Sequence, residues 1–312
     1  MHATSDGEAQ YLLAYQPVRS ADLLPLEIRG LRYTVRRWQA DGDARQILLM
    51  LHGWMDVSAS FQFLVDHLPP DWLLFAPDWR GFGLSDRGGG DTYWFADYLA
   101  DLEAIIDGLV AAGQIAPPIN LLGHSMGGNV ACLYAGVRPH RIARLVNLEG
   151  VGLPDSDPAQ APARYARWLD GLAKGMPGLR SYASPDEVAG RLMRNNPRLT
   201  PARAAFLAEH WAVCGADGRW HLRADPWHKA SHPIPYRVDE VNAFWRAISA
   251  PVLWLRGSES EVGQHLVDSD RYRARLREVR ELHSGVVQGA GHMLHHDRPQ
   301  EVAQLIRDFV GA

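Results

Sequence analysis

The sequence has little cysteine, almost no lysine and no long hydrophobic run. Its 312 residues include only two cysteines, Cys132 and Cys214, which cannot form a disulfide framework. The longest aliphatic run, ILLML at 47–51, is far shorter than the roughly 18 residues that a membrane-spanning helix needs. The first residues contain neither a basic segment nor a long apolar one, so no secretory signal is expected. We therefore expect a cytoplasmic protein in a reducing environment, without a membrane span.

Positive charge is sparse and comes almost entirely from arginine. Lys174 and Lys229 are the only lysines, the formal net charge is -4, and no dense basic run occurs. The sequence therefore gives no basic patch that would attract a phosphate backbone or an anionic membrane. Nucleic acid is not an expected partner. The preference for arginine over lysine is typical of a GC-rich bacterial genome.

The chain is rich in short apolar segments, and hydrophobic residues make up 46% of it, enough to bury a sizeable core. Apolar runs that end in Gly, Asp, Glu, Ser or His alternate with helix-like patterns, after a segment at 26–38 that is typical of an antiparallel strand pair. The runs are 46–53, 72–78, 119–125, 143–150, 251–257 and 284–292, and the helix-like patterns are 94–110, 126–137, 272–279 and 301–310. This alternation predicts an α/β fold with a mainly parallel sheet covered by helices on both faces.

One long interval breaks the alternation, with no evident strand but several capped helices. The sequence SPDE at 184–187 has the form of a capping box, and Thr200 followed by proline opens another helix. We therefore predict a helical cap, residues 153–246, inserted between two parts of the core, 1–152 and 247–312. Its tryptophans are expected either to form the small core of the cap or to add apolar wall to a pocket. They are Trp168, Trp211, Trp220, Trp227 and Trp245.

The clearest catalytic motif is LLGHSMGG at 121–128. A buried strand leads directly into the pattern G-H-S-M-G around Ser125, and a helix pattern follows at once. This is the strand-turn-helix setting of a G-x-S-x-G nucleophile elbow. Glycines allow the tight turn, and the turn exposes the serine Oγ at the end of the strand. We therefore predict that Ser125 is a nucleophile.

A second motif, His52-Gly53-Trp54, follows the first buried parallel strand. An oxyanion hole needs two backbone N–H groups, one from a loop in this position and one from the residue after the nucleophile. Trp54 and Met126 occupy those two positions and are predicted to donate their backbone N–H groups. His52 itself is expected to serve in packing and in loop hydrogen bonding.

A third motif contains three histidines after the last predicted strand. His292 follows a Gly-Ala-Gly segment, which allows the loop to turn the imidazole back toward Ser125. A neutral imidazole can take the serine proton and return it to a leaving group. His295 and His296 suggest a metal site beside it, but no paired carboxylate or cysteine accompanies them, so no metal is predicted.

The segments HGW, DWRGFGLSD (78–86), GHSMGG (123–128) and GAGHMLHHDRP (289–299), in this order, resemble the α/β-hydrolase superfamily over nearly the whole chain except the cap. The run HGWMDVSASFQFLVDHLP (52–69) is similar to the serine hydrolase-like branch of that superfamily. The resemblance implies an eight-stranded sheet, a Ser-acid-His triad and hydrolysis of esters or related acyl compounds. Asp86 stands where a G-x-G-x-x-G pattern would have its last glycine, so no dinucleotide cofactor is expected.

The triad acid is expected between Ser125 and His292, at the carboxyl end of a strand. The resemblance places it most often in the loop after strand seven, at the position that Ser260 occupies here. Three carboxylates remain as candidates: Glu259 and Glu261, which flank Ser260, and Glu149, at the end of the strand that follows the nucleophile's. A shift of one residue in the loop could bring Glu261 round. Some α/β-hydrolases, notably among the haloalkane dehalogenases, resemble this chain in placing their acid after strand six. Burying Glu149 among its apolar neighbours would be costly without a partner, and a histidine would stabilise its charged form. We therefore favour Glu149 and keep Glu261 as the alternative.

These motifs predict a serine hydrolase that cleaves a small ester, thioester or lactone through an acyl-enzyme. Ser125 attacks the carbonyl, His292 acts as base and then acid, and Glu149 orients the imidazole. Carbon–carbon bond hydrolysis or acyl transfer by the same triad is one alternative. A non-catalytic ligand-binding role, suggested by the mismatch at Ser260, is another. The expected partner is a small ester-like molecule, and no cofactor is expected.

Overall fold

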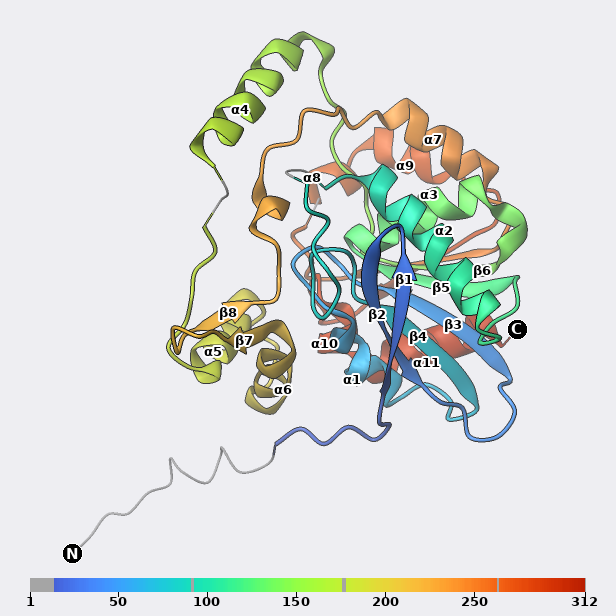
Figure 1. The fold of residues 1–312 in the computed structure, drawn as a ribbon. Coiled ribbons are helices and arrows are strands. Elements are labelled where there is room, and N and C mark those ends of the chain that lie inside the picture. The colour runs from blue at the N-terminus through green and yellow to red at the C-terminus, as the bar shows by residue number, and fades with distance from the viewer. Residues whose placement is uncertain (1–13, 91–92, 176–177, 263, 312) are drawn as a thin grey trace, which may run out of the picture.

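The computed structural model describes residues 14–90, 93–175, 178–262 and 264–311 (Figure 1). Eight strands form one sheet in the order β1-β2-β4-β3-β5-β6-β9-β10. Neighbours from β4 to β10 are parallel, whereas β2 is antiparallel to both β1 and β4, as predicted for the first pair. The strands are β1 Asp22–Ile28, β2 Leu31–Trp38, β3 Gln46–Leu51, β4 Trp72–Pro77, β5 Ile119–His124, β6 Ile142–Leu148, β9 Val252–Gly257 and β10 Leu282–Val287. The predicted eight-stranded, mainly parallel sheet is confirmed.

Helices cover both faces of this sheet. Helices α2, α3, α7 and α9 bury their apolar side chains against one face, and α1, α10 and α11 bury theirs against the other. This double coverage explains why the residues of β3, β4 and β5 are almost all buried, since a parallel sheet of this kind has no solvent-facing side. The helices are α1 Gln62–Val65, α2 Phe95–Ala111, α3 Met126–Val137, α4 Ala161–Lys174, α5 Pro185–Asn195, α6 Pro201–Trp211, α7 Val238–Ala247, α8 Gln264–Val267, α9 Asp270–Leu276, α10 Leu294–Asp297 and α11 Pro299–Val310.

The interval predicted as a cap contains α4 to α7. Helices α5 and α6 begin as expected, since Ser184 and Thr200 cap them with their side chains and a proline follows each cap. They pack around a small apolar cluster of their own, whereas α4 has no buried residue and stands apart from the sheet (Figure 1). Helix α7 lies against α3 and buries Trp245 in the main core. The division at 153–246 stays a prediction, and within it α7 covers the sheet.

The same interval holds a short hairpin that the sequence pattern did not reveal. Strands β7 (Ala212–Cys214) and β8 (Trp220–Leu222) pair antiparallel as a separate two-stranded sheet. Asp217-Gly218 lies in the connection, and Gly218 has a φ of 72°. This pair of residues is a hairpin turn signal, but strands of three residues are too short to show an alternating pattern. None of the helices in the described ranges combines the length and hydropathy that crossing a membrane requires.

Candidate active site

Ser125 alone makes the turn between β5 and α3. It has φ 52° and ψ -115°, a conformation that a non-glycine residue adopts only where the surrounding structure imposes it. A Cβ on Gly123 would lie 2.2 Å from the carbonyl oxygen of Gly127, and one on Gly127 would lie 2.1 Å from that of Leu51. The two glycines of the motif are therefore required by backbone contacts. They place the side chain of Ser125 at the carboxyl edge of the sheet, as the elbow motif predicts.

The structure brings Ser125, His292 and Glu149 into contact. The Nε2 atom of His292 lies 3.0 Å from Ser125 Oγ, and its Nδ1 atom lies 3.3 Å from Glu149 Oε2. His292 comes from the loop after β10 and Glu149 from the residue after β6, so three segments meet at one edge of the sheet. This is the order of contacts in which a base activates a nucleophile and a carboxylate orients the base.

Glu149 is held by three hydrogen-bonding partners although it is only 1% exposed. Its Oε1 accepts the backbone N–H of Gly257 at 2.6 Å, and its Oε2 accepts the hydroxyl of Ser260 at 2.7 Å as well as facing His292. Donors of this kind stabilise a buried carboxylate in its charged form. Ser260, at the position where the resemblance predicted the acid, thus supports Glu149.

The alternative acid, Glu261, lies elsewhere. Its side chain is exposed, and no hydrogen bond or ion pair of the described residues joins it to His292. The neighbouring Glu259 forms an ion pair with Arg198. The geometry therefore favours Glu149 over Glu261.

The predicted oxyanion loop packs directly against the nucleophile. A Cβ on Gly53 would lie 3.2 Å from the Cβ of Ser125, and Trp54 and Met126 both line the cavity next to Ser125. In the part of the chain that the structure describes, no protein acceptor takes the backbone N–H of either residue. Both groups are thus available to an oxyanion, and their role stays a prediction.

His52 serves in packing, as expected. It is fully buried, its Nδ1 donates to the carbonyl oxygen of Gly53 at 2.8 Å, and its Nε2 accepts the backbone N–H of Trp79 at 2.9 Å. Burial lowers its pKa to about 4, so it is neutral at pH 7. His52 therefore fixes the oxyanion loop against the loop after β4.

The other histidines of the motif lie behind the nucleophile. His296 contacts Ser60 Oγ at 2.5 Å, and His295 is buried close to Asp56 and His124. Asp56, His124 and His295 could each offer one ligand atom to a metal, and these atoms lie within 4.8 Å of one another. His124 Nε2 also donates to the carbonyl oxygen of His292 at 2.9 Å, so this buried group supports the loop that carries the base. That no metal is bound stays a prediction.

A cavity of about 380 Å³ opens above Ser125. The described residues that line it are Trp54, Tyr93, Trp94, Phe95, Tyr98, Ser125, Met126, Asn129, Glu149, Val151, Gly152, Leu153, His228, Ala230, His232 and Val262. None of the five tryptophans of the predicted cap is among them, so the idea that they wall the pocket is wrong. From the predicted cap, residues of the segment 228–232 line the cavity instead, while α5 and α6 pack in their own cluster.

Sequence reasoning missed most of this lining. Tyr93, Trp94, Phe95 and Tyr98 come from the start of α2 and the residues before it, and His228 comes from the short helical turn Pro226–Lys229. The one available signal was the density of aromatic residues at 93–98, just after the D-W-R-G-F-G motif. An aromatic cluster at helical spacing is as typical of a core as of a pocket, so the pattern alone did not separate the two.

Comparison with known proteins identifies the fold family of the chain. A family profile described as "alpha/beta hydrolase fold" matches residues 46–299. A serine hydrolase-like protein from Danio rerio is 27% identical over 277 residues, 84% of this chain and 81% of that protein. One from Mus musculus is 30% identical over 283 residues, 84% of this chain and 88% of that protein. Among solved structures, the thioesterase domain from the curacin biosynthetic pathway has a TM-score of 0.81 at 22% identity, covering 93% of this chain and 99% of that domain. The matches confirm the predicted fold class and the resemblance.

Proposed function

Because the chain belongs to the α/β-hydrolase family, we propose that it is a serine hydrolase that cleaves a small ester, thioester or lactone. Its similarity to serine hydrolase-like proteins supports hydrolase activity in general. The observation that carries the proposal is the chain of contacts from Ser125 Oγ through His292 to Glu149, at 3.0 Å and 3.3 Å. A catalytic serine needs such a base, and the base needs such a carboxylate.

In the first half of the proposed reaction, His292 Nε2 takes the proton of Ser125 while Oγ attacks the substrate carbonyl. The negative charge that develops on the carbonyl oxygen is stabilised by the backbone N–H groups of Trp54 and Met126. His292 then gives its proton to the leaving alcohol or thiol, which leaves an acyl group on Ser125. In the second half, water loses a proton to His292 and attacks the acyl carbon. The bond from the acyl carbon to Ser125 Oγ then breaks, His292 returns the proton to Oγ, and the acid is released.

Glu149 accepts the Nδ1–H of His292 and stabilises the imidazolium that forms in each half-reaction. Its position also bears on the non-catalytic alternative, which rested on the mismatch at Ser260. Ser260 donates its hydroxyl hydrogen to Glu149. The serine at that position is therefore compatible with a triad whose acid follows β6 and not β9. The mismatch therefore gives no reason to prefer an inactive protein.

The proposal is tested with p-nitrophenyl butanoate and a fluorophosphonate probe on the wild type and on Ser125→Ala. We expect the substitution to lower kcat more than about a thousandfold and to abolish labelling, because it removes the nucleophile. Ser258→Ala is the matched control, since Ser258 is an exposed serine whose Oγ accepts the N–H of Gly289 away from the triad. Equal labelling or equal turnover of the wild type and Ser125→Ala would overturn the proposal.

A further inference from the structure

One side of the cavity above Ser125 is an aromatic wall, which consists of Tyr93, Trp94, Phe95, Tyr98, His228 and His232. Its rings are stacked on one another. His228 lies between Tyr93 and Phe82, with ring centroids 3.7 Å and 3.8 Å away and ring planes tilted by 23° and 15°. Trp94 and His232 form a second stack, with centroids 4.3 Å apart. Stacks of this kind hold flat surfaces in fixed positions.

The polar side-chain atoms of Tyr93, Tyr98 and His228 in the wall have partners within the protein. The hydroxyl of Tyr93 donates to Asp225 at 2.7 Å, His228 Nε2 donates to the carbonyl oxygen of Arg80 at 3.2 Å, and the hydroxyl of Tyr98 lies 3.2 Å from His228 Nδ1. Because these groups already have partners, a ligand meets mainly the apolar ring surface that the stacks leave uncovered. The wall can therefore recognise shape and apolar surface, and it has few free donors for a charged group.

The described lining of the cavity carries no cationic side chain. Among the described residues that line it, none is a lysine or an arginine, and Glu149 is the only carboxylate. Burial lowers the pKa of His228 to about 3 and also lowers that of His232, so both imidazoles are neutral at pH 7. A carboxylate in the cavity would thus lose its hydration without gaining a counter-charge from the described lining residues, and it would lie near Glu149.

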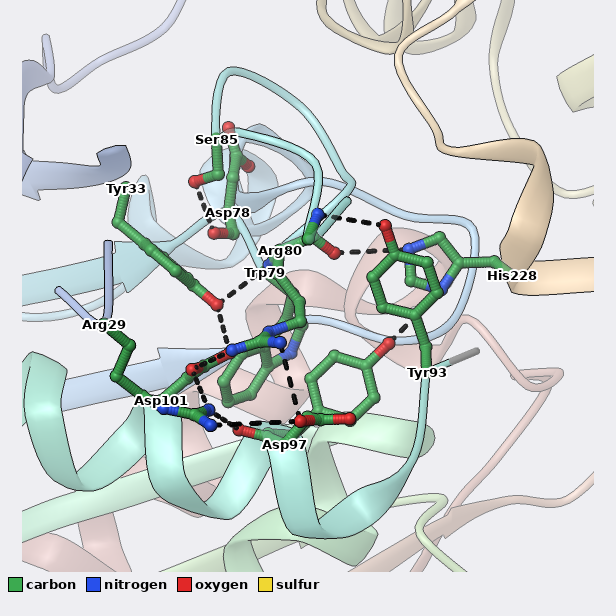
Figure 2. Close-up of polar contacts among 12 residues, drawn as sticks. Arg29, Tyr33, Asp78, Trp79, Arg80, Ser85, Tyr93, Asp97, Asp101 and His228 are labelled. Carbon is green, nitrogen blue, oxygen red and sulfur yellow. Dashed lines mark hydrogen bonds and ion pairs between the residues drawn. The ribbon is translucent and has the colours of Figure 1, made fainter. Parts of the chain in front are cut away.

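Two arginines are held behind the wall by a buried carboxylate. Figure 2 shows Arg80 and Arg29 bound to Asp101, which is fully buried and also accepts the hydroxyl of Tyr33. Arg80 also faces Asp97 at 3.5 Å. The guanidinium of Arg80 is therefore neutralised inside the protein, while its carbonyl oxygen fixes His228 in the wall. This network makes the wall rigid without making it charged.

From these contacts we infer that the cavity selects uncharged esters that carry a flat apolar ring and discriminates against esters that carry a carboxylate. The inference rests on the proposed serine hydrolase function and adds the substrate class to it. The ring lies against the aromatic wall, and the ester carbonyl lies between Ser125 and the two oxyanion donors.

The test compares kcat/KM for four esters. Methyl butanoate and monomethyl succinate differ only in a terminal methyl group against a carboxylate, and methyl phenylacetate and benzyl acetate are isomers with the ring on the acyl or the alcohol side. We expect monomethyl succinate to be at least about tenfold worse than methyl butanoate. At least one ring ester is expected to be about tenfold better than methyl butanoate, because stacking adds to the buried area.

A variant with a positive charge in the cavity provides a second test of the inference. Leu153→Arg places a cation among the lining residues and is expected to raise the succinate-to-butanoate ratio of kcat/KM at least about tenfold. Leu169→Arg is the matched control, because Leu169 is an exposed leucine of α4 that does not line the cavity. That control is expected to leave the ratio unchanged.

Failure of this inference can be told apart from failure of the proposed function. If none of the esters is turned over, binding of the same four compounds to Ser125→Ala by isothermal titration calorimetry gives the ranking without catalysis. The inference is overturned if monomethyl succinate binds or reacts as well as methyl butanoate, or if neither ring ester exceeds methyl butanoate. Serine-dependent turnover with either of those rankings would leave the hydrolase proposal intact.

Discussion

At the scale of single residues, the position of Glu149, the proposed triad acid, is the most informative feature. Glu149 has φ 60°, a left-handed conformation that few non-glycine residues adopt, and it makes hydrogen bonds to Gly257 and Ser260 from the neighbouring strand β9. Because Leu148 of β6 pairs with Leu255 of β9, the ends of these strands are adjacent. A carboxylate after β6 and a hydroxyl after β9 can thus serve the same imidazole.

Glu149→Gln is expected to lower kcat on the order of a thousandfold or more, because the amide does not stabilise an imidazolium and can favour the wrong tautomer. Glu261→Gln is the matched control and is expected to stay within about twofold of the wild type, within what a surface substitution causes. Steady-state kinetics with p-nitrophenyl butanoate and a thermal melt of each variant check this. Loss of turnover in Glu261→Gln alone would show that the acid is misassigned.

Rescue provides a second prediction at this scale. Ser260 Oγ lies 2.7 Å from the carboxylate oxygen of Glu149 that faces His292, so an aspartate at 260 can approach the same imidazole. We expect Ser260→Asp to restore kcat of Glu149→Gln at least about tenfold, because it returns a negative charge to the base. Ser258→Asp in the same background is the control, and it should restore nothing. Equal effects of the two aspartates would contradict a specific acid position at 260.

At the scale of elements, the elbow depends on how closely β5, α3 and β3 approach one another. Gly127, in the first turn of α3, lies against the backbone of Leu51 at the end of β3. Gly123, in β5, lies against Gly127 itself. The strained backbone of Ser125 is maintained by these contacts and by the hydrogen bond from its N–H to the carbonyl oxygen of Leu148 at 2.8 Å. Changes in the glycines are therefore changes in how three elements pack.

Gly127→Ala is expected to lower the free energy of unfolding by about 2 kcal/mol or more, because its Cβ would lie 2.1 Å from a backbone oxygen that cannot move aside. Gly171→Ala in α4 is the matched control, since a Cβ there has no atom within 4 Å. That change is expected to be neutral or to stabilise by up to about 1 kcal/mol through helix propensity. Urea unfolding measures both, and similar effects of the two substitutions would contradict the packing argument.

At the scale of the whole molecule, distant segments build both the pocket and a set of buried neutral histidines. The aromatic wall combines residues from the start of α2 with His228 and His232 of the cap, more than a hundred positions later in the sequence. Buried and partly buried histidines lie in this region and in the loops behind it. Burial lowers the pKa of His52 and His210 to about 4, and of His228 and His296 to about 3.

These histidines predict that stability falls with acidification. Unfolded histidine has a pKa of about 6.5, so below that pH the unfolded state binds more protons than the native state, and the free energy of unfolding decreases until the folded pKa is passed. Between pH 7.5 and 5.5 the loss is expected to exceed about 1 kcal/mol, which is the contribution of one such histidine. Urea unfolding at the two pH values measures it. Equal or greater stability at pH 5.5 would contradict the prediction.

Asp56 has the opposite effect on the pH dependence of stability. Burial raises its pKa to about 7, so its contribution to stability is present at low pH and is lost as the pH rises through that value. Asp56→Asn removes this opposing effect and is expected to make the loss between pH 7.5 and 5.5 larger than in the wild type. A smaller loss in the variant would show that Asp56 is ionised in the native protein over this range.

The order of the elements and the position of the elbow around Ser125 could be predicted from the sequence. Buried parallel strands appear as apolar runs, and helices appear with capping residues such as Ser184 and Thr200, because both patterns depend on near neighbours in the chain. The elbow around Ser125 was visible for the same reason, since its glycines lie within two residues of the serine. The favoured acid, Glu149, was chosen on a local argument about burial among apolar neighbours.

The tertiary structure decided what depends on strand order and on long-range packing. Only the adjacency of β6 and β9 brings Ser260 to Glu149, and only the fold of the cap brings His228 between Tyr93 and Phe82. A sequence pattern reports which side chains are near along the chain, whereas these contacts join residues 111 and more than 130 positions apart. The sequence by itself thus determined the fold class and the elbow motif around Ser125, and the packing of the sheet and cap determined the partners of Glu149 and the chemistry of the pocket.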